Sequence, residues 1–230
     1  MYFLDSLYSA LMLLGQFDAE LLFIVGVSLN ISFWSTVAAC LVGIPTGFVI
    51  GISSFRGKQA AITFFNTMLA LPTVVIGLVV YTLLSRRGVF GSLGWLYTQK
   101  AMIIGQIILI TPIIVAFTIA AVGRIDDRYR RTALALGASS WQVAMVILRE
   151  ARFSIMAAVV AAFGRVISEI GISMMLGGNA KGFTRTMTTA MALEYDKGEF
   201  VLSLALGIVL LAISLTVNTA LGYVQGKTLR

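Results

Sequence analysis

Two ionisable side chains, Arg165 and Glu169, stand four residues apart inside the apolar stretch 153–177. On a helix this spacing places both on one face, where they can neutralise each other. An isolated charge inside a bilayer is costly, so ionisable residues in spans are candidates for function. Two interpretations remain open for the pair and the neighbouring Ser168: a self-paired clamp between helices, or an element of a pathway or gate.

A second polar group follows the glycine-rich residues 177–182. It consists of four threonines around one arginine: Thr184, Arg185, Thr186, Thr188 and Thr189. Hydroxyls with a single guanidinium form a donor-rich, weakly charged surface that would let a tetrahedral oxyanion pass without trapping it. The alternative is an N-capped amphipathic helix at the outer membrane interface.

Side chains suited to catalysis or metal binding are scarce. The sequence has no histidine, the commonest metal ligand and general base. Its single cysteine, Cys40, lies in an apolar run and offers neither a disulfide nor a Cys-based metal site. The Gly-x-x-x-x-Gly-Lys-Ser/Thr phosphate loop is missing as well. We therefore expect no catalytic, cofactor-binding or metal-binding residues, and no ATP hydrolysis by this chain.

Composition places the chain in a bilayer, because 59% hydrophobic and 12% charged residues leave too little polar surface to cover a soluble fold. Since a bilayer-crossing helix needs about twenty apolar residues, the charge-free runs locate the spans. They predict an all-α polytopic membrane protein with about five spanning helices: residues 21–55, 59–85, 101–123, 153–177 and 200–226. The first run exceeds one crossing, so we expect it to project from the hydrocarbon or to bend near Pro45.

Prolines and small residues predict local features of these spans. Pro72 and Pro112 each free a carbonyl one turn earlier, which predicts kinks. Small residues recur along the first span: Ser28, Ser32, Thr36, Cys40, Gly43, Gly47 and Gly51. Such a stripe lets helix backbones approach closely. Packing within the subunit and the lining of a pathway or dimer seam are both open interpretations.

The distribution of basic residues predicts the orientation. With the N-terminus outside, the inner segments hold ten of them: Arg56, Lys58, Arg124, Arg128, Arg130, Arg131, Arg149, Arg152, Lys227 and Arg230. The outer segments hold six: Arg86, Arg87, Lys100, Lys181, Arg185 and Lys197. Acidic residues offset much of the outer charge, so we expect an outside N-terminus and a cytoplasmic C-terminus. The net charge of +7 then favours anionic lipid rather than nucleic acid. Residues 1–20 are predicted to form a short interfacial helix rather than a signal peptide.

The connection 124–152 carries six arginines between apolar runs. Its central part contains Ala, Leu and one glycine, Gly137, which suits two short helices joined there better than a flexible linker. A basic, structured loop between spans is a place where a partner docks.

This connection resembles the cytoplasmic coupling loop of ABC importer permeases, whose pattern is Glu-Ala-Ala, three residues, Gly, nine residues, Ile-x-Leu-Pro. Ala133, Gly137 and Ile147 occupy matching positions. Arg131 replaces the acid and Thr132 the first alanine, and the final Leu-Pro is Arg-Glu here. The resemblance implies that these residues contact an ATPase: Arg131, Thr132, Ala133, Leu134, Gly137, Ala138, Ser139 and Ile147.

Further motifs occur in the order seen in molybdate and tungstate permeases. They are Leu71-Pro72-Thr-Val-Val-Ile-Gly77, Arg86-Arg87-Gly88, Phe163-Gly-Arg165-Val-Ile-Ser-Glu169-Ile-Gly171 and Thr184-Arg-Thr-Met187. Gly177-Gly-Asn179 and Lys197-Gly-Glu-Phe200 look most similar to the tungstate branch. The pathway or gate candidates are Pro72, Arg165, Ser168, Glu169, Thr184, Arg185, Thr186 and Thr188.

The resemblance implies a type I ABC importer transmembrane domain that occupies residues 1–230 as one unit. Within it, residues 1–20 would be an outer interfacial segment, 124–152 the cytoplasmic coupling loop and 178–199 an outer gate or loop region. We expect a homodimer in a prokaryotic cell membrane, with ATP-binding cassette subunits inside and an oxyanion-binding protein outside. The expected function is tungstate import by alternating access. Import of molybdate, sulfate or another small anion is the alternative, and a channel, a secondary transporter or an intramembrane enzyme fits less well.

Overall fold

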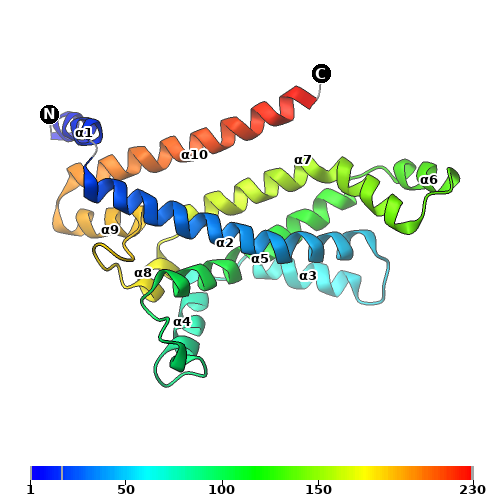
Figure 1. Cartoon of the computed structure of the whole chain (residues 1–230), viewed down its shortest axis with the longest axis horizontal. Helices are drawn as coiled ribbons and strands as arrows, with labels where there is room; N and C mark the ends of the chain where they lie inside the picture. The colour runs from blue at the N-terminus through cyan, green and yellow to red at the C-terminus, as the bar shows by residue number, and fades with distance from the viewer. Residues whose placement is uncertain (1, 17, 229–230) are drawn as a thin grey trace.

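The computed structural model describes residues 2–16 and 18–228, without the side chains of residues 2–6, 14, 221 and 224–228. Within this part the protein is helical and contains no strand (Figure 1). The helices are α1 (Tyr2–Gly15), α2 (Ala19–Ile52), α3 (Lys58–Met68), α4 (Thr73–Leu84), a short 3₁₀ helix (Gly91–Leu93), α5 (Gln99–Gly123), α6 (Asp127–Ala135), α7 (Ser140–Ile167), α8 (Gly171–Gly177), α9 (Met187–Lys197) and α10 (Phe200–Thr228). The all-α prediction is confirmed. Lys227 and Arg230, two of the basic residues assigned to the inner side, lie outside the described side chains.

Three helices of the described chain are long and apolar enough to cross a membrane singly: α2, α5 and α10. Two further pairs qualify together but are bent, α3 with α4 by 94° and α7 with α8 by 56°. Five spans are reached when each bent pair counts as one. The 34 residues of α2 measure about 51 Å at 1.5 Å per residue, well above the ~30 Å hydrocarbon core, so α2 projects beyond it as expected.

The second predicted span, 59–85, is not a single kinked helix. α3 ends at Met68, and α4 leaves at 94° after Pro72, which has an extended backbone (φ −64°, ψ 130°) and caps the new helix. Proline cannot donate to the preceding turn and forces the residue before it out of the helical region, so the helix stops rather than bends. Pro45 and Pro112, by contrast, lie inside α2 and α5 without interrupting them.

The small residues of α2 serve packing within the subunit along the second half of the helix. A Cβ at Gly47 would lie 2.6 Å from the Val115 carbonyl oxygen, and one at Gly43 would lie 2.9 Å from Ile114. Both contacts are closer than side chains tolerate, so α2 and α5 depend on glycine to approach each other. This settles the open interpretation in favour of intrasubunit packing for these two positions.

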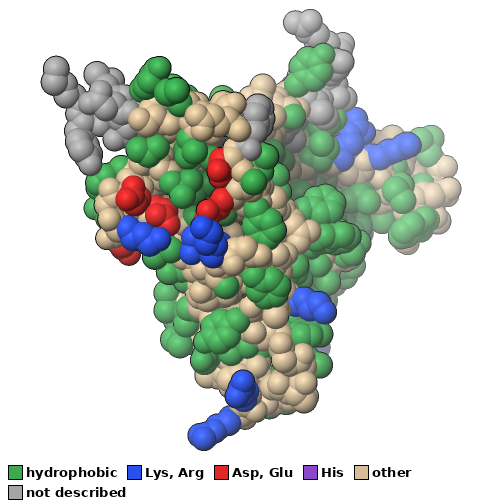
Figure 2. Space-filling view, turned by 60° about the vertical axis from the view of Figure 1, so that its left-hand side comes forward, with side chains coloured by type: hydrophobic (Ala, Val, Ile, Leu, Met, Phe, Trp, Pro, Cys, Tyr) green, Lys and Arg blue, Asp and Glu red, His purple; other side chains and the backbone are tan. Residues whose placement is uncertain are grey.

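The helices run roughly along one long axis, with different structures at its two ends (Figure 1). One end carries α6 and the start of α7. The other carries α8, α9 and the beginning of α10, and α1 lies beside α10. Figure 2 shows that hydrophobic side chains cover much of the flank, that the acidic side chains in view gather beside basic ones in one cluster, and that other basic side chains lie apart from it. The basic loop and the threonine-rich segment are therefore far apart.

Candidate functional site

The docking turn, residues 133–141, joins α6 to α7 through a tight and well-capped connection. Gly137 has φ +80°, in the left-handed region that glycine adopts readily. The Gly137 amide donates to the Leu134 carbonyl, and the Ala138 amide donates to the Ala133 carbonyl, both at 3.0 Å. Ser139 then caps α7 in a capping box with Gln142. The turn at Gly137 is thus confirmed.

The second helix of this connection is not short. α7 continues without a break from Ser140 to Ile167, because no proline or glycine interrupts the sequence before Gly164. The docking turn is consequently the end of a 28-residue rod that reaches into the spanning region. A continuous helix rather than a flexible linker therefore connects the turn to the spanning region.

Apolar side chains project from the docking turn. Leu136 is 83% exposed and Trp141 is 73% exposed, on either side of Gly137, and Leu134 is also exposed. Exposed large apolar groups at a polar, charged tip mark a protein contact, and tryptophan is a frequent binding hot spot. Sequence reasoning missed Leu136 and Trp141. Their signal was two large apolar residues flanking a breaker glycine.

The residues predicted to contact an ATPase divide into two groups. The exposed ones are Arg131, Thr132, Leu134, Gly137 and Ser139, while Ala133 and Ala138 are half-buried. Ile147 is buried in a cluster with Val143 and Ala151 of α7 and Val122 of α5. Ile147 therefore holds α7 against the neighbouring helices and is not available to a partner, which corrects its assignment to the contact.

The arginines of α6 have acidic neighbours on the same helix. Arg131 Nε contacts Asp127 Oδ2 at 2.7 Å, and Arg128 contacts Asp126 at 3.7 Å. All four side chains are exposed, so each pair contributes little to stability. Their effect is to cancel charge locally. Arg131, which stands where the family pattern has an acid, thus has an acidic partner one turn earlier in Asp127.

At the opposite end of α7, Arg165 and Glu169 form the predicted ion pair. Arg165 Nη1 donates to Glu169 Oε2 at 2.6 Å, and the Ile172 amide donates to Glu169 Oε1 at 3.2 Å. The side chain of Glu169 is only 3% exposed, whereas that of Arg165 is 41% exposed. The carboxylate is thus buried and satisfied, while the guanidinium reaches the surface of the subunit.

The predicted single helix through this pair is wrong in one respect. α7 ends at Ile167, and Ser168 to Ile170 separate it from α8, which departs at 56°. The Ser168 hydroxyl donates to the carbonyls of Gly164 and Arg165 and so satisfies the end of α7. Glu169 accepts a hydrogen bond from the amide of Ile172 in the first turn of α8. The pair therefore spans a helix break and does not lie on a continuous face.

The threonine-rich segment is buried and does not form a surface. Thr184, Arg185, Thr186 and Thr188 are all at most 9% exposed. Their hydroxyls satisfy nearby backbone: Thr184 Oγ1 donates to Gly177 O at 2.6 Å, and Thr188 Oγ1 donates to Glu169 O at 2.9 Å. The alternative interpretation is right about the N-cap, because Thr186 caps α9. The first turn of this helix is buried against the protein, and its position relative to the membrane interface stays a prediction.

These elements meet in a polar crevice lined by Ser28, Ile31, Ser32, Gln106, Val166, Ile167, Glu169, Ser173, Thr186 and Thr188. The crevice is too narrow to hold a water molecule. Gln106 of α5 crosses it, accepting from Ser35 at 3.2 Å and donating to Ser173 at 3.3 Å. The sequence signal for Gln106 was one amide in an otherwise apolar span. No ion passes through this junction in the present conformation.

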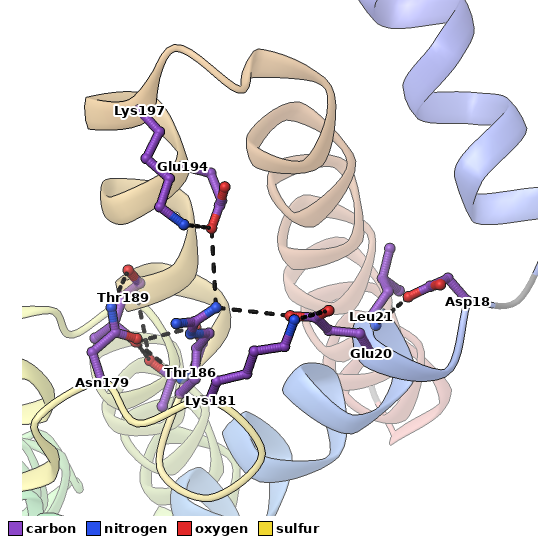
Figure 3. A network of polar contacts seen from close by, with 10 residues as sticks. Asp18, Glu20, Leu21, Asn179, Lys181, Thr186, Thr189, Glu194 and Lys197 are labelled. Atoms are coloured by element: carbon purple, nitrogen blue, oxygen red, sulfur yellow. Dashed lines mark hydrogen bonds and ion pairs between the residues drawn. The ribbon is translucent and has the colours of Figure 1, made fainter.

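A cluster of ion pairs lies beside the crevice (Figure 3). Glu20 near the start of α2 contacts Lys181 at 2.6 Å and the buried Arg185 at 3.7 Å. Glu194 of α9 contacts Arg185 at 4.0 Å and Lys197 at 2.9 Å. This ion cluster joins α2, the loop 178–186 and α9. Sequence reasoning did not single out Glu20 or Glu194, because their partners are distant in the chain.

Comparisons with known proteins show the family to which the chain belongs. Residues 43–230 match the family described as "Binding-protein-dependent transport system inner membrane component". The chain is 40% identical over 204 residues to a "Probable anion ABC transporter permease protein" of Haloferax volcanii, covering 86% of this chain and 88% of that protein. It is 37% identical over 224 residues to the "Tungstate uptake system permease protein TupB" of Peptoclostridium acidaminophilum, covering 97% and 98%.

Solved structures share the fold. The inward-facing MetNI methionine ABC transporter superposes with a TM-score of 0.73 at 17% identity, covering 89% of this chain and 94% of that chain. At this identity the likeness concerns the fold alone, and it confirms the type I ABC importer architecture expected from the sequence.

Proposed function

The chain belongs to the family of binding-protein-dependent transport system inner membrane components, and from this we propose that it is the permease subunit of an ATP-driven tungstate importer. The observation that carries the substrate is the 37% identity to a tungstate uptake permease over 97% of the chain. In this proposal the permease hydrolyses no ATP itself. Energy comes from separate ATP-binding cassette subunits on the cytoplasmic side.

The docking turn is the proposed contact with those ATPase subunits. Leu134, Leu136 and Trp141 offer apolar side chains around a glycine turn that a bulky residue would distort. Because α7 runs unbroken from this turn to the Arg165–Glu169 region, closure of the ATPase dimer would move the spanning part directly. This rigid connection is what alternating access requires of a coupling element.

The helix breaks are the proposed hinges of the transport cycle. Pro72 separates α3 from α4, and Ser168 and Glu169 separate α7 from α8. Hinges are short segments at the ends of rigid elements that absorb backbone rotation. Opening of the polar crevice would expose Thr186 and Thr188 beside Glu169 and Arg165, and so give the oxyanion a passage rich in hydroxyl groups.

The ion cluster and the loop 178–186 form the proposed outer face, where the binding protein delivers its ion. This orientation places the N-terminus outside and the C-terminus in the cytoplasm. A homodimer, with one docking turn per ATPase subunit, completes the assembly. The whole of residues 1–230 acts as one transmembrane domain, with 124–152 inside and 178–199 outside.

Uptake by a deletion strain tests this function. Cells that lack the transporter, complemented with this permease and its cognate ATPase and receptor, should accumulate tungsten from nanomolar medium, and a tenfold excess of molybdate or sulfate should compete weakly. Stronger uptake of molybdenum or sulfate than of tungsten would move the assignment to another oxyanion. Uptake that does not require the ATPase would reject an ABC importer in favour of a channel or secondary transporter.

A further inference from the structure

A groove of about 310 Å³ opens between α5 and α7 in the part of the subunit nearest α6. Small side chains of α7, including Ser154, Ala157 and Ala161, form one wall, and Phe117 and Ala120 of α5 belong to the other. Since a water molecule occupies about 30 Å³ in the liquid, the groove has room for a tetrahedral oxyanion with part of its hydration shell.

The groove has a positive charge at its mouth. Arg124, which follows the last residue of α5, lines it and is exposed. Among the described residues Arg124 has neither a hydrogen bond nor an ion pair, and the nearest acids in sequence are engaged by Arg128 and Arg131. The charge of Arg124 is therefore not cancelled by a protein neighbour and is available to an anion.

A second arginine stands one turn beyond the other end of the groove. Arg165 follows Ala161 by four residues on α7, which places the two on the same face of that helix. A guanidinium carries five donors, and only the one to Glu169 is engaged here. The side chain is 41% exposed, so the remaining donors are open to a ligand.

We propose that Arg165 and Arg124 are successive weak stations for a tetrahedral dianion, and that the groove between them is the inner part of its path. This inference rests on the proposed oxyanion import and assigns residues to it. Glu169 offsets the charge of Arg165 and solvent screens Arg124, so neither station holds the ion tightly. Weak, separated sites are what conduction requires, because an ion must leave each site as readily as it enters.

The spacing of the two stations supports a stepwise passage. Ser154, which lines the groove together with Arg124, lies eleven residues from Arg165 along α7, which corresponds to about 16 Å at 1.5 Å per residue. That separation exceeds the Debye length of about 8 Å at physiological ionic strength. An ion in the groove beside Ser154 and an ion at Arg165 would therefore repel each other only weakly where solvent reaches both.

Charge-selective labelling of engineered cysteines tests the path. In a Cys40→Ser background, Ser154→Cys and Ala161→Cys report on the groove, and Val160→Cys reports on the separate apolar groove beside α2 and α10. The assembled complex in lipid nanodiscs is treated with anionic or cationic methanethiosulfonate, and each rate is divided by that of a small free thiol. The anionic reagent should react about tenfold faster at the two groove positions, as a positively charged cleft focuses anions. It should show no such preference at Val160→Cys.

Added tungstate should slow the reaction of the anionic reagent at the groove cysteines. Arg124→Gln should abolish the faster reaction of the anionic reagent relative to the cationic one. Arg149→Gln, which replaces an exposed arginine outside the groove, should leave that difference intact. Equal normalised rates for both reagents, unreactive groove cysteines, or an advantage that survives Arg124→Gln would overturn the path. Stimulation of the ATPase by tungstate-loaded receptor, measured in the same preparation, distinguishes failure of the proposed path from failure of the proposed import function. With stimulation present, a negative labelling result removes the path and leaves the import function; without it, the import function itself fails.

Discussion

Arg165 donates to Glu169 across 2.6 Å even though α7 ends between them at Ile167. The pair therefore joins two helices that meet at 56°, and it does so with a buried carboxylate and a half-exposed guanidinium. With this asymmetry one pair could both fix the proposed hinge and offer charge to a passing ion. Both interpretations drawn from the sequence thus have a structural basis, and a mutant series distinguishes them.

The single variant Arg165→Met should be strongly destabilised, because it leaves the buried Glu169 without its partner, a loss of about 3–5 kcal/mol. The double variant Arg165→Met/Glu169→Met should regain most of that stability. Thermal unfolding of the purified permease measures both. If the double variant folds, binds the ATPase and fails to transport, the pair belongs to the pathway; if it folds and transports normally, the pair is a clamp only.

Replacement of the exposed apolar groups of the docking turn should uncouple the transporter. Leu136→Ala/Trp141→Ala should insert in the membrane normally but lose most receptor-stimulated ATP hydrolysis in the complex, since hot-spot truncations cost about 2 kcal/mol or more in binding. Gly137→Asp and Ala133→Trp should act in the same direction. The matched control is Leu211→Ala, which truncates an equally exposed leucine on α10. Normal stimulation in the double variant would place the ATPase contact elsewhere.

The hydrogen bond from Thr188 to the carbonyl of Glu169 should matter for stability. Thr188→Val leaves a buried carbonyl without a donor, which costs about 1–3 kcal/mol. Thr216→Val is the control, because that hydroxyl donates to the carbonyl of Ala212 on the exposed side of α10. The thermal midpoint should fall clearly for Thr188→Val and little for Thr216→Val. Equal shifts of the thermal midpoint would show that the hydrogen bond from Thr188 stabilises the protein no more than the exposed bond of Thr216 does.

Topology can be measured with reporter fusions. Alkaline phosphatase is active only outside the cytoplasm, so a fusion after residue 140 should be inactive and one after residue 190 should be active. The physical reason is the excess of basic residues in the segments assigned to the inner side. An active fusion at residue 140 would invert the orientation and place the docking turn on the wrong side for an ATPase.

The sequence predicted the helical class, the approximate spans and the turn at Gly137, because apolar runs and a breaker glycine are local signals. It did not predict the 94° turn at Pro72, since the apolar content of residues 59–85 does not depend on the direction of the chain. Proline signalled only that the helix is interrupted there.

Burial of the threonines was beyond sequence reasoning for a different reason. Their position depends on contacts between distant residues, such as Ser28 accepting from the amide of Met187, 159 positions away. The same holds for Glu20 and Glu194, whose roles are set by Arg185 and the two lysines. Polar residues in apolar surroundings indicate that a partner exists, but only the fold identifies it.

The central claim is that this permease moves an oxyanion that a receptor selects and an ATPase drives. Arg165 is already faced by Glu169, and the buried Arg185 by Glu20 and Glu194, whereas tight binding of a dianion normally recruits several donors or net positive charge. The isolated permease should therefore show no micromolar tungstate binding by calorimetry. The most direct measurement is ATP hydrolysis by the reconstituted complex. Tungstate-loaded receptor should raise the rate severalfold over empty receptor, whereas an unchanged rate, or stimulation only by a receptor loaded with an amino acid or a sugar, would contradict the account.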